Sequence, residues 1–220
     1  MTLISMDALA GVLQEIIAAQ PGAVAAWHEA EPKGLDEPAP EADLDTLRTL
    51  AVSQHLCNHR LWHVEDEARR TDVGPEVIAD CKRRIDALNQ KRNDLIERVD
   101  ACLVALVTPL VPEGASERYN TETAGMALDR LSIIALKVHH MREQAQRADA
   151  SDEHRHSCAA KLAVLDEQRA DLARAVGELL AEYVAGTKRP KVYYQFKMYN
   201  DPSLNPALYA ARAVREADKG

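Results

Sequence analysis

The residues of this chain best suited to chemistry are histidines followed by a carboxylate three positions later. The pairs are His63-x-x-Asp66 and His140-x-x-Glu143. On a helix, positions i and i+3 lie on one face, so each pair can bind one metal ion, or the carboxylate can orient the imidazole. Ordinary hydrogen-bonded helix residues would have the same spacing, and this second interpretation stays open.

We expect a polar site around these pairs, in which His63, Asp66 and His140 act as general acid, general base or ligand. A divalent metal in such a site would take carboxylate ligands close to the histidines. The candidate metal ligands are Glu65, Asp66, Asp94 and Glu143. His55 and His59 precede His63 at intervals of four residues, which places them on the same helical face.

Two arginines take positions where a helix bundle normally has leucine. Arg92 and Arg169 come seven residues after Ile85 and Leu162, in the apolar stripes of two long helices. A buried guanidinium is costly unless it is paired, so each must meet a protein carboxylate or an anionic ligand. The candidate carboxylates are Glu65, Asp66 and Glu143. The candidate ligand-binding residues are Asn89, Arg92, Arg130, Arg169, Lys197 and Tyr199.

Composition restricts the fold class and the partners. Of 220 residues, 46% are hydrophobic and only 4% aromatic, and Ala, Leu, Glu, Arg and Gln dominate, which favours helices over strands. The net charge of −8 argues against a general affinity for nucleic acid. The chain has no run of eighteen apolar residues and no basic N-terminal region, so we expect a cytoplasmic protein with no membrane span. The partners that remain are a small-molecule ligand and a second copy in a homo-oligomer.

Prolines, glycines and apolar periodicity divide the chain into three parts. Residues 1–42 should hold a helix from Ile4 to Ala19 and then a proline-rich linker, because Pro21 cannot continue a helix. Residues 43–185 should form a helical bundle. Its third long helix should begin after Asn120 or Thr121, either of which can cap it. The predicted helices of the bundle cover about 43–70, 75–107, 121–148 and 152–185, and residues 186–220 form a C-terminal tail.

The bundle itself is predicted to be a tandem duplication of one helical hairpin. An ungapped shift of 77 residues matches polar as well as apolar positions, including the pairs His63/His140 and Arg92/Arg169. The two repeats cover about 43–107 and 120–185. Because similar hairpins bury their apolar stripes against each other, we predict an all-α fold. It is a four-helix bundle from two duplicated hairpins, with an extra N-terminal helix and an irregular C-terminal tail.

The C-terminal tail is basic and aromatic. Between Gly186 and Asn200 it has no acid. Its basic residues are Lys188, Arg189, Lys191 and Lys197, and the aromatic residues among them are Tyr193, Tyr194, Phe196 and Tyr199. Such a segment could close over the mouth of the bundle as a lid, with lysines on phosphate and tyrosines stacked on a sugar or base. Packing of the aromatic side chains against the bundle is the alternative.

Four strings of this sequence resemble a bacterial family known as domain of unknown function 4254. They are NHRLWHVEDEARR, KRRIDALNQKRNDLIERVD, NTETAGMALDRLSIIALKVHHMRE and YQFKMYNDPSLNPALY, and the resemblance covers about residues 43–210. It implies that the family's motif positions are Trp62, His63, Glu65, Asp66, Arg69, Asp86, Asn89, Arg92, Asp94, Asn120, Glu122, Thr123, Asp129, Arg130, His140, Gln195, Lys197, Tyr199 and Asn200. His55 and His59 lie outside the core of the clearest motif, so the resemblance does not imply a three-histidine face.

A fainter similarity is to all-helical nucleotide pyrophosphohydrolases of the MazG type, in which paired carboxylates on helices bind magnesium. Glu65-Asp66 and Glu97-x-x-Asp100 would take those parts here, although Ala68 stands where a further acid is expected.

Two functions are consistent with these features. The first is an enzyme or binding protein for a small phosphorylated or sugar-linked ligand, with a polar His/Asp/Glu/Arg site inside the bundle and a divalent metal as its candidate cofactor. The alternative is a non-catalytic, oligomeric adaptor of a glycan-assembly pathway, which the family resemblance suggests, with a purely structural polar network. An open pocket lined by both hairpins would favour the first function, and a closed salt-bridge network the second.

Overall fold

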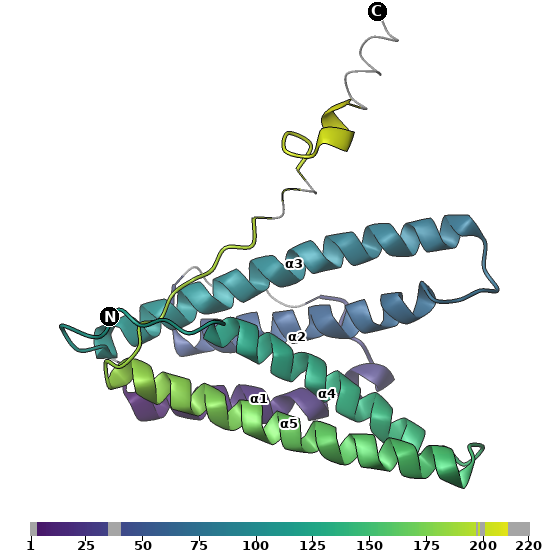
Figure 1. Ribbon diagram of the computed structural model, residues 1–220, viewed down its shortest axis with the longest axis horizontal. Helices are drawn as coiled ribbons and strands as arrows, with labels where there is room; N and C mark the ends of the chain where they lie inside the picture. The colour runs from purple at the N-terminus through teal and green to yellow at the C-terminus, as the bar shows by residue number, and fades with distance from the viewer. Residues whose placement is uncertain (1–3, 35–40, 197, 199–200, 211–220) are drawn as a thin grey trace, which may run out of the picture.

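The computed structural model describes residues 4–34, 41–196, 198 and 201–210. Over this part of the chain the protein is helical and contains no strand, so the predicted all-α class is confirmed (Figure 1). The elements are α1 (Met6–Glu29), α2 (Leu44–Glu67), α3 (Pro75–Val107), the 3-10 turn η1 (Thr108–Leu110), α4 (Ala124–Gln146) and α5 (Asp152–Val184).

Side-chain caps and a proline set where these helices begin. The hydroxyl or carboxylate of the N-cap residue accepts a backbone N–H in the first turn of α1, α2, α4 and α5, which stabilises each helix by about 1 kcal/mol. The capping residues are Ser5, Asp43, Thr123 and Ser151. Pro75 occupies the first turn of α3, where its missing N–H costs nothing. The predicted caps Asn120 and Thr121 are wrong, because Thr123 caps α4.

The prediction that the first helix ends at Ala19 is also wrong, because α1 continues through Pro21 to Glu29. Proline has no N–H to donate to the carbonyl four residues earlier, which here belongs to Ile17. The guanidinium of Arg169 on α5 donates to this Ile17 carbonyl instead. A hydrogen bond from another helix therefore satisfies the acceptor that proline leaves free, and α1 gains about two further turns.

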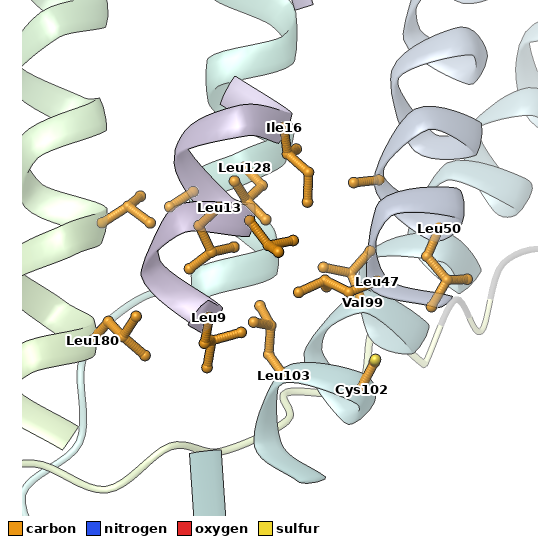
Figure 2. Packing of buried hydrophobic residues seen from close by; sticks show 14 of the residues in the cluster. Leu9, Leu13, Ile16, Leu47, Leu50, Val99, Cys102, Leu103, Leu128 and Leu180 are labelled. Atoms are coloured by element: carbon orange, nitrogen blue, oxygen red, sulfur yellow. The ribbon is translucent and has the colours of Figure 1, made fainter. Parts of the chain in front are cut away.

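The helices pack as two hairpins that meet directly through α4, and α1 packs against both hairpins. α2 pairs with α3 and α4 with α5, while α1 packs against α4, α2 and α5 (Figure 1). Figure 2 shows that leucines of α1, among them Leu9 and Leu13, lie at the centre of the main core and meet side chains from all four other helices. Leu9 and Leu47 are completely buried. The N-terminal helix is therefore an integral part of the core.

Helix bounds agree with the proposed duplication. Adding 77 to the residue numbers of α3 (Pro75–Val107) gives those of α5 (Asp152–Val184), and the same shift carries α2 close to α4. Common descent of the two hairpins is not shown by this agreement and stays a prediction.

Length and apolar composition alone would allow α1 to cross a membrane, contrary to our expectation from the sequence. Its buried residues Leu9, Val12, Leu13, Ile16 and Ile17 belong to the main core. The core helix of a globular bundle has the same composition, so this feature carries no conclusion about location.

The described part of the tail does not form a lid. Lys188 and Arg189 bind acidic residues and carbonyl groups near the C-terminal end of α5, and the backbone N–H of Gln195 donates to Glu97 on α3 at 2.7 Å. Beyond this point the chain leaves the bundle (Figure 1). Tyr194 and Phe196 are 62% and 83% exposed, so the alternative of aromatic packing fails for these two residues as well. Lys197 and Tyr199 lie outside the described residues.

Candidate functional site

A buried polar network connects α2, α3 and α4 through the carboxylate of Asp129. This side chain, on α4, accepts two hydrogen bonds from Arg92, with Nε at 2.8 Å from Oδ1, and further bonds from Gln54 and Asn58 of α2. Asp129, Gln54 and Asn58 are all at most 5% exposed. Charge-assisted bonds of this kind compensate for the removal of the carboxylate and the guanidinium from water.

The network continues from Asn58 toward α1. Asn58 donates to Ser132 Oγ at 2.9 Å, and Ser132 Oγ lies 2.6 Å from Nδ1 of His55. His55 Nε2 lies 3.0 Å from the carbonyl of Gln20, which can only accept, so Nε2 carries the proton and Ser132 donates to Nδ1. Burial lowers the pKa of His55 to about 4, so this imidazole is neutral at pH 7. Because Ser132 is completely buried, this chain of bonds is structural.

The arginine partners differ from those predicted. Arg92 pairs with Asp129, which lies on α4, and none of the carboxylates proposed from the sequence takes part. Arg169 donates to a backbone carbonyl of α1, and its buried Nε has no hydrogen-bond partner among the described residues. Burial accordingly lowers the pKa of Arg169. The two arginines that the 77-residue shift matches thus have different partners in the fold.

Five histidines from three helices gather beside this network. They are His28 of α1, His59 and His63 of α2, and His139 and His140 of α4. The ring centroid of His28 lies 4.4–5.0 Å from those of the other four. His63 and His140, the pair matched by the 77-residue shift, have centroids 6.0 Å apart. The structure therefore brings together the two histidines singled out by the sequence.

Hydrogen bonds fix the protonation of two of these rings. His28 Nδ1 lies 2.7 Å from the carbonyl of Val24, and His140 Nδ1 lies 2.8 Å from the carboxylate of Glu143. Both partners are acceptors, so Nδ1 carries the proton in the neutral tautomer of each ring, and Nε2 is then the nitrogen with the lone pair. In metal sites, a histidine that donates one ring N–H to a carbonyl or carboxylate binds the metal through its other nitrogen, which is Nε2 in these two residues.

Several nitrogen atoms of the cluster are buried without a hydrogen bond among the described residues. They are Nδ1 of His59 and Nε2 of His139 and His140. The Nε2 atom of His139 lies 3.5 Å from Glu143, outside hydrogen-bonding geometry. Leaving such a group unsatisfied costs about 1–3 kcal/mol each. Helix packing alone gives no compensation for this cost.

The cluster is electrically neutral at pH 7 in its buried part. Burial, together with the nearby rings of His63 and His28, lowers the pKa of His59 to about 4. Burial also lowers the pKa of His63 and that of His139. Neutral imidazoles keep a lone pair on each ring, which is the state in which histidine binds a metal ion.

An open pocket of about 390 Å³ lies between the two hairpins, next to the Asp129 network. It is lined by Asn58, Leu61, Trp62, Glu65, Asp66, Arg69, Asn89, Arg92, Ile133 and Leu136. The indole of Trp62 forms one wall of the pocket. The same indole stacks on the ring of His140, with ring centroids 4.7 Å apart and planes 10° from parallel. The pocket and the histidine cluster thus share an aromatic boundary.

The three predicted catalytic residues do not face one cavity. Asp66 lines the pocket beside Trp62, whereas His63 lines a second cavity with Glu31, and His140 lines an apolar groove between α4 and α5. Asp66, His63 and His140 therefore do not share one reaction site, as the predicted catalytic centre would require.

The predicted carboxylate metal ligands are also dispersed. Glu65 forms an ion pair with Arg69, Asp94 accepts from Gln90, and only Glu143 contacts histidines of the cluster. The second acidic pair of the fainter resemblance is separate as well, because Asp100 is buried against Thr123 and Gly125. Among the ligand-binding candidates, Asn89 and Arg92 line the pocket, while Arg130 pairs with Glu122 at the surface.

Two important residues were missed from the sequence, and a third, Asp129, was named only as a motif position of the family and not as the partner of Arg92. His28 was assigned to a linker, because the helix was ended before Pro21. His139 stands next to His140, and this double histidine was the signal that was overlooked. Asp129 is the one acid in the apolar stretch AGMALDRLSIIALKV, which is typical of a buried carboxylate that needs a cation.

Comparisons with known proteins agree with the resemblance noted in the sequence. A family described as protein of unknown function (DUF4254) matches residues 48–192, a span that contains the pocket and four of the five clustered histidines. No curated protein and no solved structure matches the chain. Since the match covers well over half of the sequence, the chain belongs to the DUF4254 family.

Proposed function

We propose that this protein binds a small phosphorylated or sugar-linked ligand in the pocket beside Trp62. The observation that carries the proposal is the composition of this pocket, which takes its lining from α2, α3 and α4 and therefore from both hairpins. Pockets of a few hundred Å³ with an aromatic wall and a few polar groups are typical small-molecule sites.

The polar lining suits an anionic ligand with hydroxyl groups. Arg69 and Arg92 supply positive charge, and Asp129 engages only Nε and Nη2 of Arg92, which leaves Nη1 for a ligand. Asn89 adds an amide that can both donate and accept hydrogen bonds. The face of Trp62 offers an apolar platform of the kind that binds a sugar ring or a base.

The geometry supports binding more strongly than a particular reaction. Asp66 is the single predicted catalytic residue that lines the pocket, and it lies there with Glu65, which already pairs with Arg69. A carboxylate in this position can accept a proton from a ligand hydroxyl. The proposal therefore assigns Asp66 to ligand contact and names no bond that is made or broken.

The test is a calorimetric titration of the full chain with inorganic phosphate, sugar phosphates, nucleotides and nucleotide sugars. Arg69 and Asn89 are partly or fully exposed, so Arg69→Gln and Asn89→Ala should fold normally. Each should weaken the affinity for the best ligand by about tenfold, the value of one lost hydrogen bond to a charged group. Arg70→Gln is the matched control, because Arg70 pairs with Asp72 outside the pocket, and it should leave the affinity unchanged.

The second candidate, a non-catalytic adaptor, is favoured by two observations. Arg92 is paired with Asp129 in a buried network, which is a structural use of the arginine. Tyr194 and Phe196 are exposed on a segment that leaves the bundle, as expected for a contact with a partner protein. The same titration separates the two candidates: an adaptor gives no saturable heat with any of the small ligands.

A further inference from the structure

We propose that the five-histidine cluster binds one divalent transition-metal ion of the zinc class, with His28 as its central ligand. The cluster consists of His28, His59, His63, His139 and His140, which come from three different helices. The metal site is independent of the small-ligand pocket: it uses no residue that lines that pocket, and either proposal can fail alone.

The distances between donor atoms fit a site of this type. Two sets of three histidines, His28 with His59 and His63, and His28 with His139 and His140, each offer ligand nitrogens that lie within 4.8 Å of one another. Zinc–nitrogen bonds are about 2.0–2.1 Å long, so two ligands of one ion lie up to about 4 Å apart. Side-chain rotations that move the nitrogen atoms by about 1 Å are enough to close either set around an ion.

The hydrogen bonds allow one ion per chain. His28 belongs to both sets, and its Nδ1 is held by the carbonyl of Val24, so Nε2 is its single available donor. One lone pair binds one metal ion, and the two sets therefore exclude each other.

Two carboxylates contact histidines of the cluster in the way that normally orients metal-binding histidines. The Glu143 carboxylate accepts from His140 Nδ1 and directs Nε2 inward, and Nε2 is buried without another partner. The carboxylate of Glu31 lies 3.9 Å from Nε2 of His59, which leaves the unpartnered Nδ1 of His59 as the inner nitrogen. Both carboxylates also offset the charge of the ion.

The chemistry of the donors selects the metal. Imidazole nitrogen binds Zn²⁺, Ni²⁺ and Cu²⁺ well, whereas Mg²⁺ and Ca²⁺ prefer oxygen ligands. Simple packing of neutral rings explains their stacking, but it does not explain why three inward nitrogens of one cluster lack a hydrogen bond. An ion in the set of His28, His139 and His140 accepts the lone pairs of two of these nitrogens, and an ion in the other set accepts that of His59.

The ion also has a route from solvent. His28 is exposed near the C-terminal end of α1, while His59, behind it, is 1% exposed. A site with several ligands open to solvent and His59 beneath them can be loaded without opening the core.

The test uses the full chain without a histidine tag, dialysed against a chelator and then titrated with ZnCl₂ by calorimetry, with elemental analysis of the product. Wild-type protein should bind about one equivalent of Zn²⁺, and MgCl₂ should give no saturable binding. His28→Gln should weaken Zn²⁺ binding by about 100-fold or more, and Glu143→Gln by about tenfold, because orienting partners contribute on this scale. His156→Ala, which removes an exposed histidine of α5 outside the cluster, should change the affinity less than twofold.

A second variant protects the test against a folding defect in α1. The double change His63→Gln and His140→Gln removes one ligand from each set and leaves α1 untouched, so it too should lose tight binding. Circular dichroism establishes that each variant is helical before the titration. Absence of saturable Zn²⁺ binding by the wild-type chain, or wild-type affinity in both variants, overturns the proposal.

Discussion

At the scale of single residues, Asp129 is the central acceptor of the buried polar network. Its carboxylate forms an ion pair with Arg92 and also accepts hydrogen bonds from Gln54 and Asn58. Four donors converge on its two oxygens, so its loss would leave the Arg92 cation and the Gln54 amide without this acceptor, and Asn58 with only its bond to Ser132. The polar network is thus organised around one carboxylate on α4.

We expect Asp129→Asn to destabilise the fold by about 3 kcal/mol, because it removes the countercharge of a largely buried Arg92 and turns an amide donor toward other donors. Adding Arg92→Met should recover at least about 1 kcal/mol, since the unpaired charge is then absent. Urea unfolding measures both values. Asp86→Asn, which breaks an exposed pair with Lys82, is the control and should cost under about 0.5 kcal/mol. Equal losses in the single and double variants would argue against an unpaired charge as the cause.

Asp100 gives the fold a pH dependence of definite sign. Burial raises its pKa from 3.8 to about 6, against the opposing hydrogen bonds from Thr123 and Gly125. The folded state thus keeps the proton to higher pH than the unfolded chain does. The associated stability is fully present below pH 3.8 and is lost as the pH rises through 6.

Replacement of this carboxyl by an amide should remove that dependence. In Asp100→Asn the amide oxygen can accept from the Gly125 N–H, and the amide nitrogen can donate to Thr123. Relative to wild type, the variant should gain about 2–3 kcal/mol between pH 4 and 7. Urea unfolding over this range measures the difference, and Asp94→Asn, an exposed change on the same helix, should follow the wild-type curve. A constant difference between Asp100→Asn and wild type at every pH would contradict this assignment.

At the scale of helices, α1 depends on α5. Pro21 deprives the carbonyl of Ile17 of its helical donor, and Arg169 donates to that carbonyl from α5. The hydrogen bond fastens the middle of α1 to the second hairpin. It also lets α1 reach His28 in the same helical register.

A double-mutant cycle isolates this dependence. Arg169→Met should destabilise the protein by about 1–3 kcal/mol, because a buried carbonyl loses its donor. In a Pro21→Ala background the N–H of residue 21 can bond to Ile17, so the same change should cost at least about 1 kcal/mol less. Thermal or urea unfolding of the four proteins gives the coupling energy. Additive effects of the two changes would remove the proposed link between proline and arginine.

Helix boundaries separate what the sequence predicts from what it cannot. The bounds of α3 were predicted from Pro75 and the apolar stripe, and the end of α5 from the glycine that follows it, since these signals are local. The end of α1 was wrong because the residue that stabilises Pro21 lies on another helix. Local signals are sufficient until a tertiary hydrogen bond replaces a local one.

The candidate site shows the same division. The pairs His63–Asp66 and His140–Glu143 could be found from spacing, and the structure does place both histidines in one cluster. His28 and His59 join them through packing of three helices, which no spacing within one helix records. The partner of Arg92 was missed for the same reason, because it lies on a helix whose facing was unknown.

At the scale of the whole molecule, the N-terminal helix changes the architecture expected from a duplication. Two similar hairpins could form a symmetrical four-helix bundle, but α1 packs against both of them and its residues lie at the centre of the core (Figure 2). It packs against α4 and α5 of the second hairpin and against α2 of the first. Equivalent positions in the two hairpins therefore have different neighbours, and their residues serve different purposes.

Arg169 also has a consequence for how relatives of this chain can vary. Its hydrogen bond is needed because residue 21 is proline, so these two positions, 148 residues apart in the chain, constrain each other. A relative with another amino acid at the position of Pro21 is free to replace this arginine by leucine, the residue that such a stripe ordinarily prefers. Inherited together or lost together, proline and arginine should be recognisable as a correlated pair in an alignment of sequences that include the N-terminal helix.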